Sequence, residues 1–244
     1  MERLQKVMAH AGVDSRRKCE ELIKQGRVTV NQVKVVELGY KVSKQDVIEV
    51  DGVPIYQEEP VYYLFYKPKN VLSSVSDDRS RPVVTDYFQS IKTRLYPVGR
   101  LDFDTSGLLL MTNDGEFANL MMHPKHQIDK TYIAKVKGIP TPALMRKLER
   151  GIVIDGKKTS PAVAKIMSVN EAKQTGLVQL TIHEGWNHQV KKMFEAVQLP
   201  VQKLKRESFG FLTLDHLQSG EWRILKGYEV EKLVKIASNN GRKS

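Results

Sequence analysis

Three charged side chains occupy alternate positions directly before one of the most apolar stretches of the chain. Arg100, Asp102 and Asp104 lie within five positions, and a run of one Gly, three Leu and one Met begins shortly after them. If the segment is extended, these three charges share one face, while Leu101 and Phe103 point the other way. A charge beside a buried strand is costly unless it has a partner or a chemical role. The segment is therefore a candidate catalytic site.

Several chemistries remain open for these residues. They could form a surface salt bridge with no further role. Two neighbouring carboxylates could serve a glycoside hydrolase or a nuclease, where the separation of the carboxyl groups matters. A hard metal would need more oxygen ligands than this stretch supplies. The glycine-poor surroundings exclude a phosphate-cradling loop of the usual type.

A second candidate stretch, HEGWNHQVKKMF, begins at His183. His183 and His188 are five positions apart with Glu184 beside the first, which misses the helical His-Glu-x-x-His zinc pattern by one residue. We therefore expect no metal here. On a helix, Lys191 follows Asn187 by four positions, and a lysine on that face can reach an aspartate brought alongside in space.

The charge of the chain points to a polyanionic partner. Among 244 residues, 39 Lys and Arg face 28 Asp and Glu, a formal net charge of 39 − 28 = +11. The sequence contains no run of ~18 apolar residues that would predict a membrane span. The N-terminus lacks the apolar core of a signal peptide. A lone cysteine, Cys19, excludes internal disulfides and fits a reducing cytoplasm. Nucleic acid is thus the leading partner.

The first part of the chain predicts a small basic module, residues 1–52, followed by a linker at 53–60. Apolar spacing indicates helices over 2–11 and 16–25, and valines around Asn31-Gln32 suggest a hairpin before a strand at 47–50. No acidic run neutralises its basic side chains, which are Arg3, Lys6, Arg16, Arg17, Lys18, Lys24, Arg27 and Lys34.

The remainder, 61–237, predicts an α+β domain with a mostly antiparallel sheet, because strands and helices alternate without regular βαβ spacing. A polar tail, 238–244, is expected to be disordered. Strands are predicted at 61–66, 108–112, 130–136 and 177–182, and helices after Gly115, over 142–150 and over 185–197.

The N-terminal stretch LQKVMAHAGVDSRRKCEELIKQGRVTVNQ closely resembles the S-four-type RNA-binding domain. This resemblance implies that RNA contacts the second helix and the turn before it, at Ser15, Arg16, Arg17 and Lys18. We add Arg3 and Lys34 of the same module to the expected RNA contacts.

Three later stretches, GRLDFDTSGLLLMTNDGEFAN, DKTYIAKVKG and HEGWNHQVKKMF, resemble in order the core motifs of RNA pseudouridine synthases of the RsuA/RluB type. The resemblance implies that Asp102 is the catalytic aspartate and Asp104 a non-catalytic acid. It further implies that Tyr132 stacks on the target base and that Lys191 pairs with Asp102. Arg100, His188 and Gln189 are expected to contact RNA.

The implied reaction explains why one carboxylate would suffice. Breaking the C–N glycosidic bond of uridine, rotating the uracil and rejoining it through carbon needs no redox change, so we expect no cofactor. An ionised Asp102, held by a cation, would add to the ribose or take a ribose proton, and the sequence leaves both open. The target base must leave the stack to be reached.

The sequence resembles two branches of the family that act on different rRNA substrates. GEFANLMMHPKHQIDKTYIAKVKG and SSVSDDRSRPVV resemble the branch that acts on large-subunit rRNA, whereas His-Gln-Val-Lys is shared with small-subunit enzymes. We expect rRNA or a pre-ribosomal particle as partner and large-subunit rRNA as substrate, for a cytoplasmic monomer. Small-subunit rRNA, or a non-catalytic rRNA-binding assembly protein, is the alternative.

Overall fold

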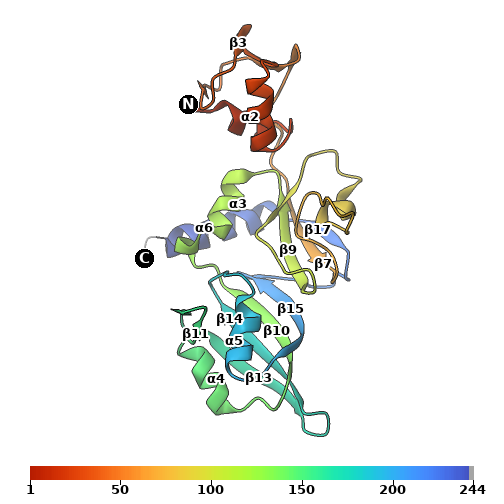
Figure 1. Ribbon diagram of the computed structural model, residues 1–244, viewed down its shortest axis with the longest axis vertical. Coiled ribbons are helices and arrows are strands. Elements are labelled where there is room, and N and C mark those ends of the chain that lie inside the picture. Colours follow the sequence, from red (N-terminus) through yellow and green to blue (C-terminus); the bar gives the residue numbers. More distant parts are fainter. Residues whose placement is uncertain (242–244) are drawn as a thin grey trace. The chain divides into compact units, whose positions relative to one another are not determined.

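Two units make up the part of the chain that the computed structural model describes, residues 1–241 (Figure 1). The first comprises Met1–Val61 together with Ile91–Arg94 and Asn113–Gly115. The second comprises Tyr62–Ser90, Leu95–Thr112 and the described chain from Glu116 onward. No helix among these residues is long and apolar enough to cross a membrane.

The first unit contains the predicted two helices followed by strands. Helices α1 (Leu4–His10) and α2 (Arg16–Lys24) pack on a core that includes Met8, Cys19 and Ile23. The Ser15 hydroxyl accepts a hydrogen bond from the amide of Lys18 at 3.3 Å and so caps α2. The strands are β1 (Glu2–Arg3), β2 (Val28–Val30), β3 (Val33–Val35), β4 (Lys41–Val42), β5 (Ile48–Val50) and β6 (Val53–Pro54).

The sheet of this unit has the order β3-β2-β5-β6, and β1 pairs separately with β4. Asn31 and Gln32 both have positive φ, 50° and 67°, which suits the tight turn between β2 and β3. Strand β6 takes up the first two residues of the predicted linker, because Val53 and Pro54 pair with β5.

The second unit is built on one nine-stranded sheet with the main order β13-β14-β10-β15-β9-β7-β17. Only the β15–β9 pair among the described strands is parallel within this sheet, so the predicted mostly antiparallel α+β fold is confirmed. Strand bounds are β7 (Tyr62–Lys67), β8 (Tyr96–Val98), β9 (Ser106–Thr112), β10 (Lys130–Lys137), β13 (Val163–Asn170), β14 (Thr175–Ile182), β15 (Val201–Phe209), β16 (Leu212–Thr213) and β17 (Trp222–Ile224). A separate pair is formed by β11 (Val153–Ile154) and β12 (Lys157–Lys158).

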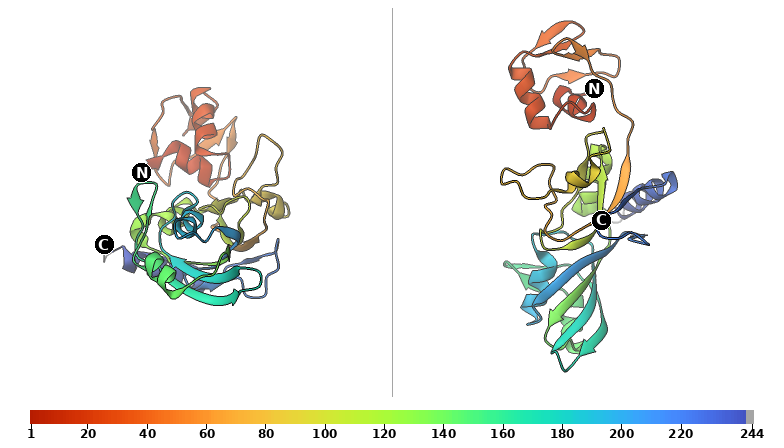
Figure 2. Two further views of the ribbon diagram at one scale, coloured as in Figure 1. Left: turned by 60° about the horizontal axis from the view of Figure 1, so that its bottom comes forward. Right: turned by 90° about the vertical axis from the view of Figure 1, so that its right-hand side faces the viewer.

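Helices cover different parts of this sheet. Residues of α3 (Gly115–Met122) and α6 (Gly227–Asn240) share a core with Leu108 and Leu110 of β9. Helix α5 (Gln189–Ala196) contacts β15, and α4 (Pro142–Glu149) contacts β13 (Figures 1 and 2). Short 3-10 helices lie at Val84–Phe88 (η1) and Pro124–His126 (η2).

Helix α6 extends into the segment 238–244 that the sequence predicts to be disordered. Its last turn includes Asn239 and Asn240, because Ala237 is buried and the Asn240 amide donates to the carbonyl of Gln127 at 3.3 Å. The prediction of disorder is therefore wrong for 238–240, and residues 242–244 lie outside the described part.

Gly107 lies opposite Arg206 where β9 pairs with β15. Its φ is +122°, and a Cβ at this position would lie 2.3 Å from the carbonyl oxygen of Arg206. Only glycine fits such an approach without moving the backbone. The start of β9, directly after Asp102 and Asp104, is thereby fixed against the centre of the sheet.

Candidate active site

The segment before β9 forms a turn and is not extended. The amide of Thr105 donates to the carbonyl of Asp102 at 3.1 Å, which closes a turn over residues 102–105. The condition for alternating faces is therefore not met, and Phe103 is 39% exposed. Arg100 is exposed, while the side chain of Asp102 is only 25% exposed and that of Asp104 is 66% exposed.

Backbone hydrogen bonds from two neighbouring segments hold this loop. The Ser73 hydroxyl donates to the carbonyl of Leu101 at 2.9 Å and accepts from its amide at 3.0 Å. The amide of Asn70 donates to the carbonyl of Phe103 at 2.7 Å. The residues on both sides of Asp102 are thus fixed, which limits the positions its carboxylate can take.

Lys67 fastens the same turn from inside the protein. Its side chain is fully buried, and its Nζ donates to the carbonyls of Asp102 (3.2 Å), Thr105 (2.8 Å) and Pro68 (2.9 Å). Burial lowers the pKa of Lys67 to about 8, although the charges of Asp102 and Asp104 act in the opposite direction. The sequence does not predict this role of Lys67. The one sequence feature that points to a buried lysine is that Lys67 ends the apolar strand 62–67.

Replacing Lys67 should impair turnover more than RNA binding. In Lys67→Met the three carbonyls lose their donor, so the turn that carries Asp102 should loosen, and a displacement of about 1 Å costs roughly 10²-fold in rate. Steady-state kinetics and RNA-binding titrations measure the two effects separately. Lys69→Met is the matched control, since Lys69 is exposed two positions away. Equal turnover in both variants would contradict this role of Lys67.

The loop before α5 is held by a network around Glu184. Its carboxylate accepts from the Ser160 hydroxyl at 2.8 Å and from the Gln189 amide group at 2.7 Å. The Gln189 side-chain oxygen in turn accepts from the amide of Trp186 at 3.0 Å. Gln189, an expected RNA contact, is only 3% exposed, so its amide shapes this loop, and its contact with RNA stays a prediction.

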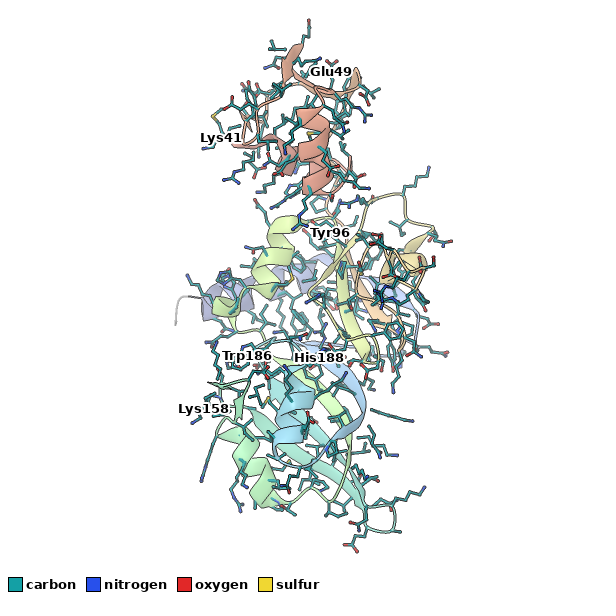
Figure 3. The ribbon with its side chains drawn as sticks, in the orientation of Figure 1. Lys41, Glu49, Tyr96, Lys158, Trp186 and His188 are labelled. Atoms are coloured by element: carbon teal, nitrogen blue, oxygen red, sulfur yellow. The ribbon has the colours of Figure 1, made fainter. Side chains whose placement is uncertain are left out.

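The same network keeps residues 185–188 outside the helix. The sequence predicts a helix from 185, but α5 begins at Gln189, and His188 has a left-handed φ of 54°. Figure 3 marks Trp186 and His188 at this end of α5. The left-handed backbone of His188 and the start of α5 direct the His188 ring toward the turn at 102–105. The Lys191 side chain, one helical turn later, points toward the same turn.

Asp102 lies at the centre of a small charged cluster. Its Oδ2 is 3.0 Å from Nζ of Lys191 and 2.9 Å from Nδ1 of His188. The Lys191 Nζ also donates to Oδ1 of Asp104 at 2.5 Å. The sequence predicts the lysine beside Asp102 and an RNA contact for His188, so the contact of His188 with Asp102 is a further finding.

The cluster keeps Asp102 ionised. Partial burial by itself would raise the pKa of Asp102, but the hydrogen bonds of His188 and Lys191, with the charge of Lys191, lower it below its ordinary value. Burial likewise would lower the pKa of Lys191, yet its bonds to Asp104 and Asp102 raise it overall. An ion pair at neutral pH is the consequence.

Tyr132 lies on β10, on the face of the strand that is buried. It is 8% exposed and stands between Leu180 and Arg206 of the neighbouring strands. Arg206 is 3% exposed, and its Nε donates to the carbonyl of Leu108 at 2.7 Å. The structure thus places Tyr132 within the central sheet, and its contact with a target base stays a prediction.

The expected RNA contacts of the first unit are mostly exposed. Arg16, Arg17 and Lys18 project from the first turn of α2, and Lys18 lies 3.5 Å from Asp14. Arg3 and Lys34 are exposed as well. Ser15 is only partly exposed, because its hydroxyl caps α2.

The α+β domain with its lysine-paired carboxylate and the small basic module each match a known family. The profile of RNA pseudouridylate synthases matches residues 61–196, and the S4 domain matches residues 2–48. A solved structure described as a pseudouridylate synthase covers 96% of this chain and 100% of its own, with 32% identity and a TM-score of 0.68.

Curated relatives extend over the whole chain. A protein of Bacillus subtilis (strain 168) named ribosomal large subunit pseudouridine synthase B is 60% identical over 239 residues, covering 98% of both chains. An uncharacterized RNA pseudouridine synthase of Aquifex aeolicus is 38% identical and covers 96% of this chain and 94% of its own. The chain belongs to the RNA pseudouridine synthase family, and it is an isomerase of that class, as its sequence predicts.

Proposed function

We propose that this enzyme converts a uridine of large-subunit rRNA to pseudouridine, with Asp102 as the catalytic carboxylate. The observation that carries the chemistry is the Asp102 carboxylate held 3.0 Å from Lys191 on a loop fixed by Ser73 and Lys67. The choice of substrate rests on the name of the Bacillus subtilis relative.

In the proposed reaction, the C1′–N1 bond of the target uridine breaks and its electron pair leaves with the uracil. The base then turns, C5 bonds to C1′, the proton on C5 is released and N1 takes up a proton, so that the product is an isomer of the substrate. Asp102 either adds to the ribose or takes a ribose proton. Lys191 and His188 hold the carboxylate in its ionised form at neutral pH.

The test is release of tritium from rRNA labelled at C5 of uracil, because only replacement of the C5–H bond frees that label. Large-subunit and small-subunit rRNA would be offered in parallel. We expect release from large-subunit rRNA alone. Release only from small-subunit rRNA would support the alternative substrate, and binding without release would support a non-catalytic assembly protein.

Tyr132→Phe should retain more activity than Tyr132→Ala. The proposed role is to stack on the flipped base, which needs the ring and not the hydroxyl, and stacking is worth ~1–3 kcal/mol per base. Turnover with labelled rRNA and thermal melting should be measured together, since Tyr132 is mostly buried. An equal loss of turnover in both variants would show that the hydroxyl group is required. Full turnover in Tyr132→Ala would exclude Tyr132 from the site.

The basic residues of the first unit should set affinity and not the rate of the chemical step. Replacing Arg16, Arg17 and Lys18 by Gln removes up to three phosphate contacts, so the slope of log affinity against log salt should fall by ~2–3. The matched control replaces exposed Arg146, Lys147 and Arg150 by Gln, which changes the charge equally. Identical slopes for the two triple variants would contradict the assignment.

The remaining parts of the proposal concern organisation. Residues 1–52 act as the RNA-binding module, 53–60 as the linker and 61–237 as the catalytic domain, with support from the matches at 2–48 and 61–196. The enzyme works as a cytoplasmic monomer, and the isomerisation requires no nucleotide cofactor.

A further inference from the structure

Strands β13, β14, β10 and β15 carry helix α5 on one face only. Buried side chains such as Ala134, Val136 and Leu180 alternate along these strands with more exposed ones. The right-hand view of Figure 2 shows α5 on one side of these strands, and α6 on the other side beside the end of β15 only. The opposite face of β13, β14 and β10 carries no helix in this view, and Lys165 and Lys203 are exposed.

The residues of this open face are fixed by the strand register. One row across the sheet consists of Lys165, Gln179, Ile133 and Lys205, and the next consists of Ser168, Leu177, Lys135 and Lys203. Lys137 continues the line of Lys135 on β10. We call this surface, Lys135, Lys137, Lys165, Lys203 and Lys205 with the residues between them, the lysine face.

The protein neutralises only part of the lysine face. Glu207 pairs with Lys205 at 2.5 Å, and Glu171 stands in the turn between β13 and β14. Lys135, Lys165 and Lys203 form no ion pair among the described residues. Lys135 and Lys203 are even direct cross-strand partners, an arrangement in which like charges destabilise a sheet. Such uncompensated repulsion indicates an anionic partner.

The chemistry of the lysine face selects the type of contact. Lys165 and Lys205 stand at the two ends of the first row, three strand spacings apart. At ~4.8 Å per spacing, their backbone positions are about 14 Å apart. An open hollow beside Lys135 adds the polar side chains of Ser168, Asn170 and Lys173. No aromatic side chain stands in either row, so the surface cannot stack unpaired bases as single-strand binders do.

We propose that the lysine face binds the phosphate backbone of a helical segment of the substrate RNA, away from the target uridine. This inference rests on the proposed rRNA substrate. Lys191 and His188, which contact Asp102, belong to α5 and its N-terminal end, and α5 lies on the other face of these strands. An RNA that reaches both faces must be a folded rRNA domain or pre-ribosomal particle, and a single hairpin is too small.

The test compares Lys135→Gln/Lys165→Gln/Lys203→Gln with a control of equal charge, Lys147→Gln/Lys226→Gln/Lys235→Gln, whose lysines are exposed elsewhere on this unit. Binding to a full-length large-subunit rRNA transcript is titrated over a range of salt concentrations. The lysine-face variant should bind about tenfold more weakly at ~0.1 M salt, with a slope lower by ~2–3, while the control changes little. Its melting temperature should equal or exceed that of the wild type, because the repulsion between Lys135 and Lys203 is gone.

A short hairpin that carries the target uridine provides the second arm. On this substrate the lysine-face variant should turn over like the wild type, since a hairpin at the active site does not reach the opposite face. Equal affinity and slope for the lysine-face and control variants on the long rRNA would overturn the proposal. Single variants Lys135→Gln and Lys165→Gln should each lower the slope by about one, and a zero change in both would also overturn it. Failure of the wild type to modify rRNA would refute the proposed function separately, because the salt slopes are measured by binding alone.

Discussion

Asp102→Asn is expected to abolish tritium release from labelled rRNA while RNA affinity stays close to that of the wild type. Asparagine has nearly the same size, so the turn closed by Thr105 and Lys67 should persist. It lacks the charge, and with it both the nucleophile and the base of the proposed reaction. The phosphate contacts that supply most of the affinity are unchanged. Turnover and binding must be measured on the same RNA preparation.

Asp104→Asn is the matched control for this experiment. Asp104 bonds to the same Lys191, but its side chain is 66% exposed, compared with 25% for Asp102. We expect Asp104→Asn to retain most of the turnover. Substantial activity in Asp102→Asn would refute the catalytic assignment. If Asp104→Asn were inactive and Asp102→Asn active, Asp104 would be the catalytic carboxylate.

Lys191→Met is expected to reduce turnover at neutral pH by ~10²–10³-fold, the usual effect of removing one preorganised electrostatic group from a site. The control is Lys192→Met, because Lys192 pairs with Asp155 and contacts neither carboxylate of the turn. Lys191→Arg keeps the charge but changes the geometry and should lie between the two. A Lys191→Met enzyme as active as Lys192→Met would contradict the role of the pair.

The pH dependence of kcat gives this prediction a definite direction. Burial raises the pKa of Asp102, and the bonds of His188 and Lys191 bring it below its ordinary value. Without Lys191, burial is less opposed, so the pKa rises and the acid limb of the kcat profile moves to higher pH. Because the folded pKa of Asp102 is depressed, its ion pair stabilises the wild type above the unfolded pKa of about 3.9, and this contribution disappears as the pH falls. An unshifted acid limb would show that another group controls it.

Elements with clear periodicity could be predicted from the sequence. The sequence predicts the helix over 142–150, and in the structure the Thr141 hydroxyl accepts from the amide of Leu144 at 3.4 Å before α4. The strand at 130–136 was expected from alternation and is β10. In both cases local preference and burial favour the same structure.

Strand β15 was not predicted because its apolar pattern is interrupted by charge. In Val201–Phe209, Lys203 and Lys205 face outward and Arg206 is buried, so only Leu204 and Phe209 are buried apolar positions. A buried arginine that donates to the carbonyl of Leu108 depends on a strand distant in sequence. Periodicity within one window cannot reveal such a partner.

The geometry of the candidate site depended on similar long-range contacts. The resemblance to the family selected Asp102 and Lys191, and the structure places them 3.0 Å apart. It did not predict the turn at 102–105, because the lysine that fastens it, Lys67, lies 35 positions before Asp102. Likewise, the delayed start of α5 follows from the bond between Ser160 and Glu184, 24 positions apart.

The most direct test of the account is a map of pseudouridines in large-subunit rRNA from cells lacking this gene. Three strains are compared: the deletion strain complemented with the wild-type gene, the same strain complemented with Asp102→Asn, and the deletion strain with no complementing gene. The account predicts that one pseudouridine of large-subunit rRNA is present with the wild type and absent from the other two strains. Its presence in the Asp102→Asn strain, or an identical map in all three strains, would contradict the central claim.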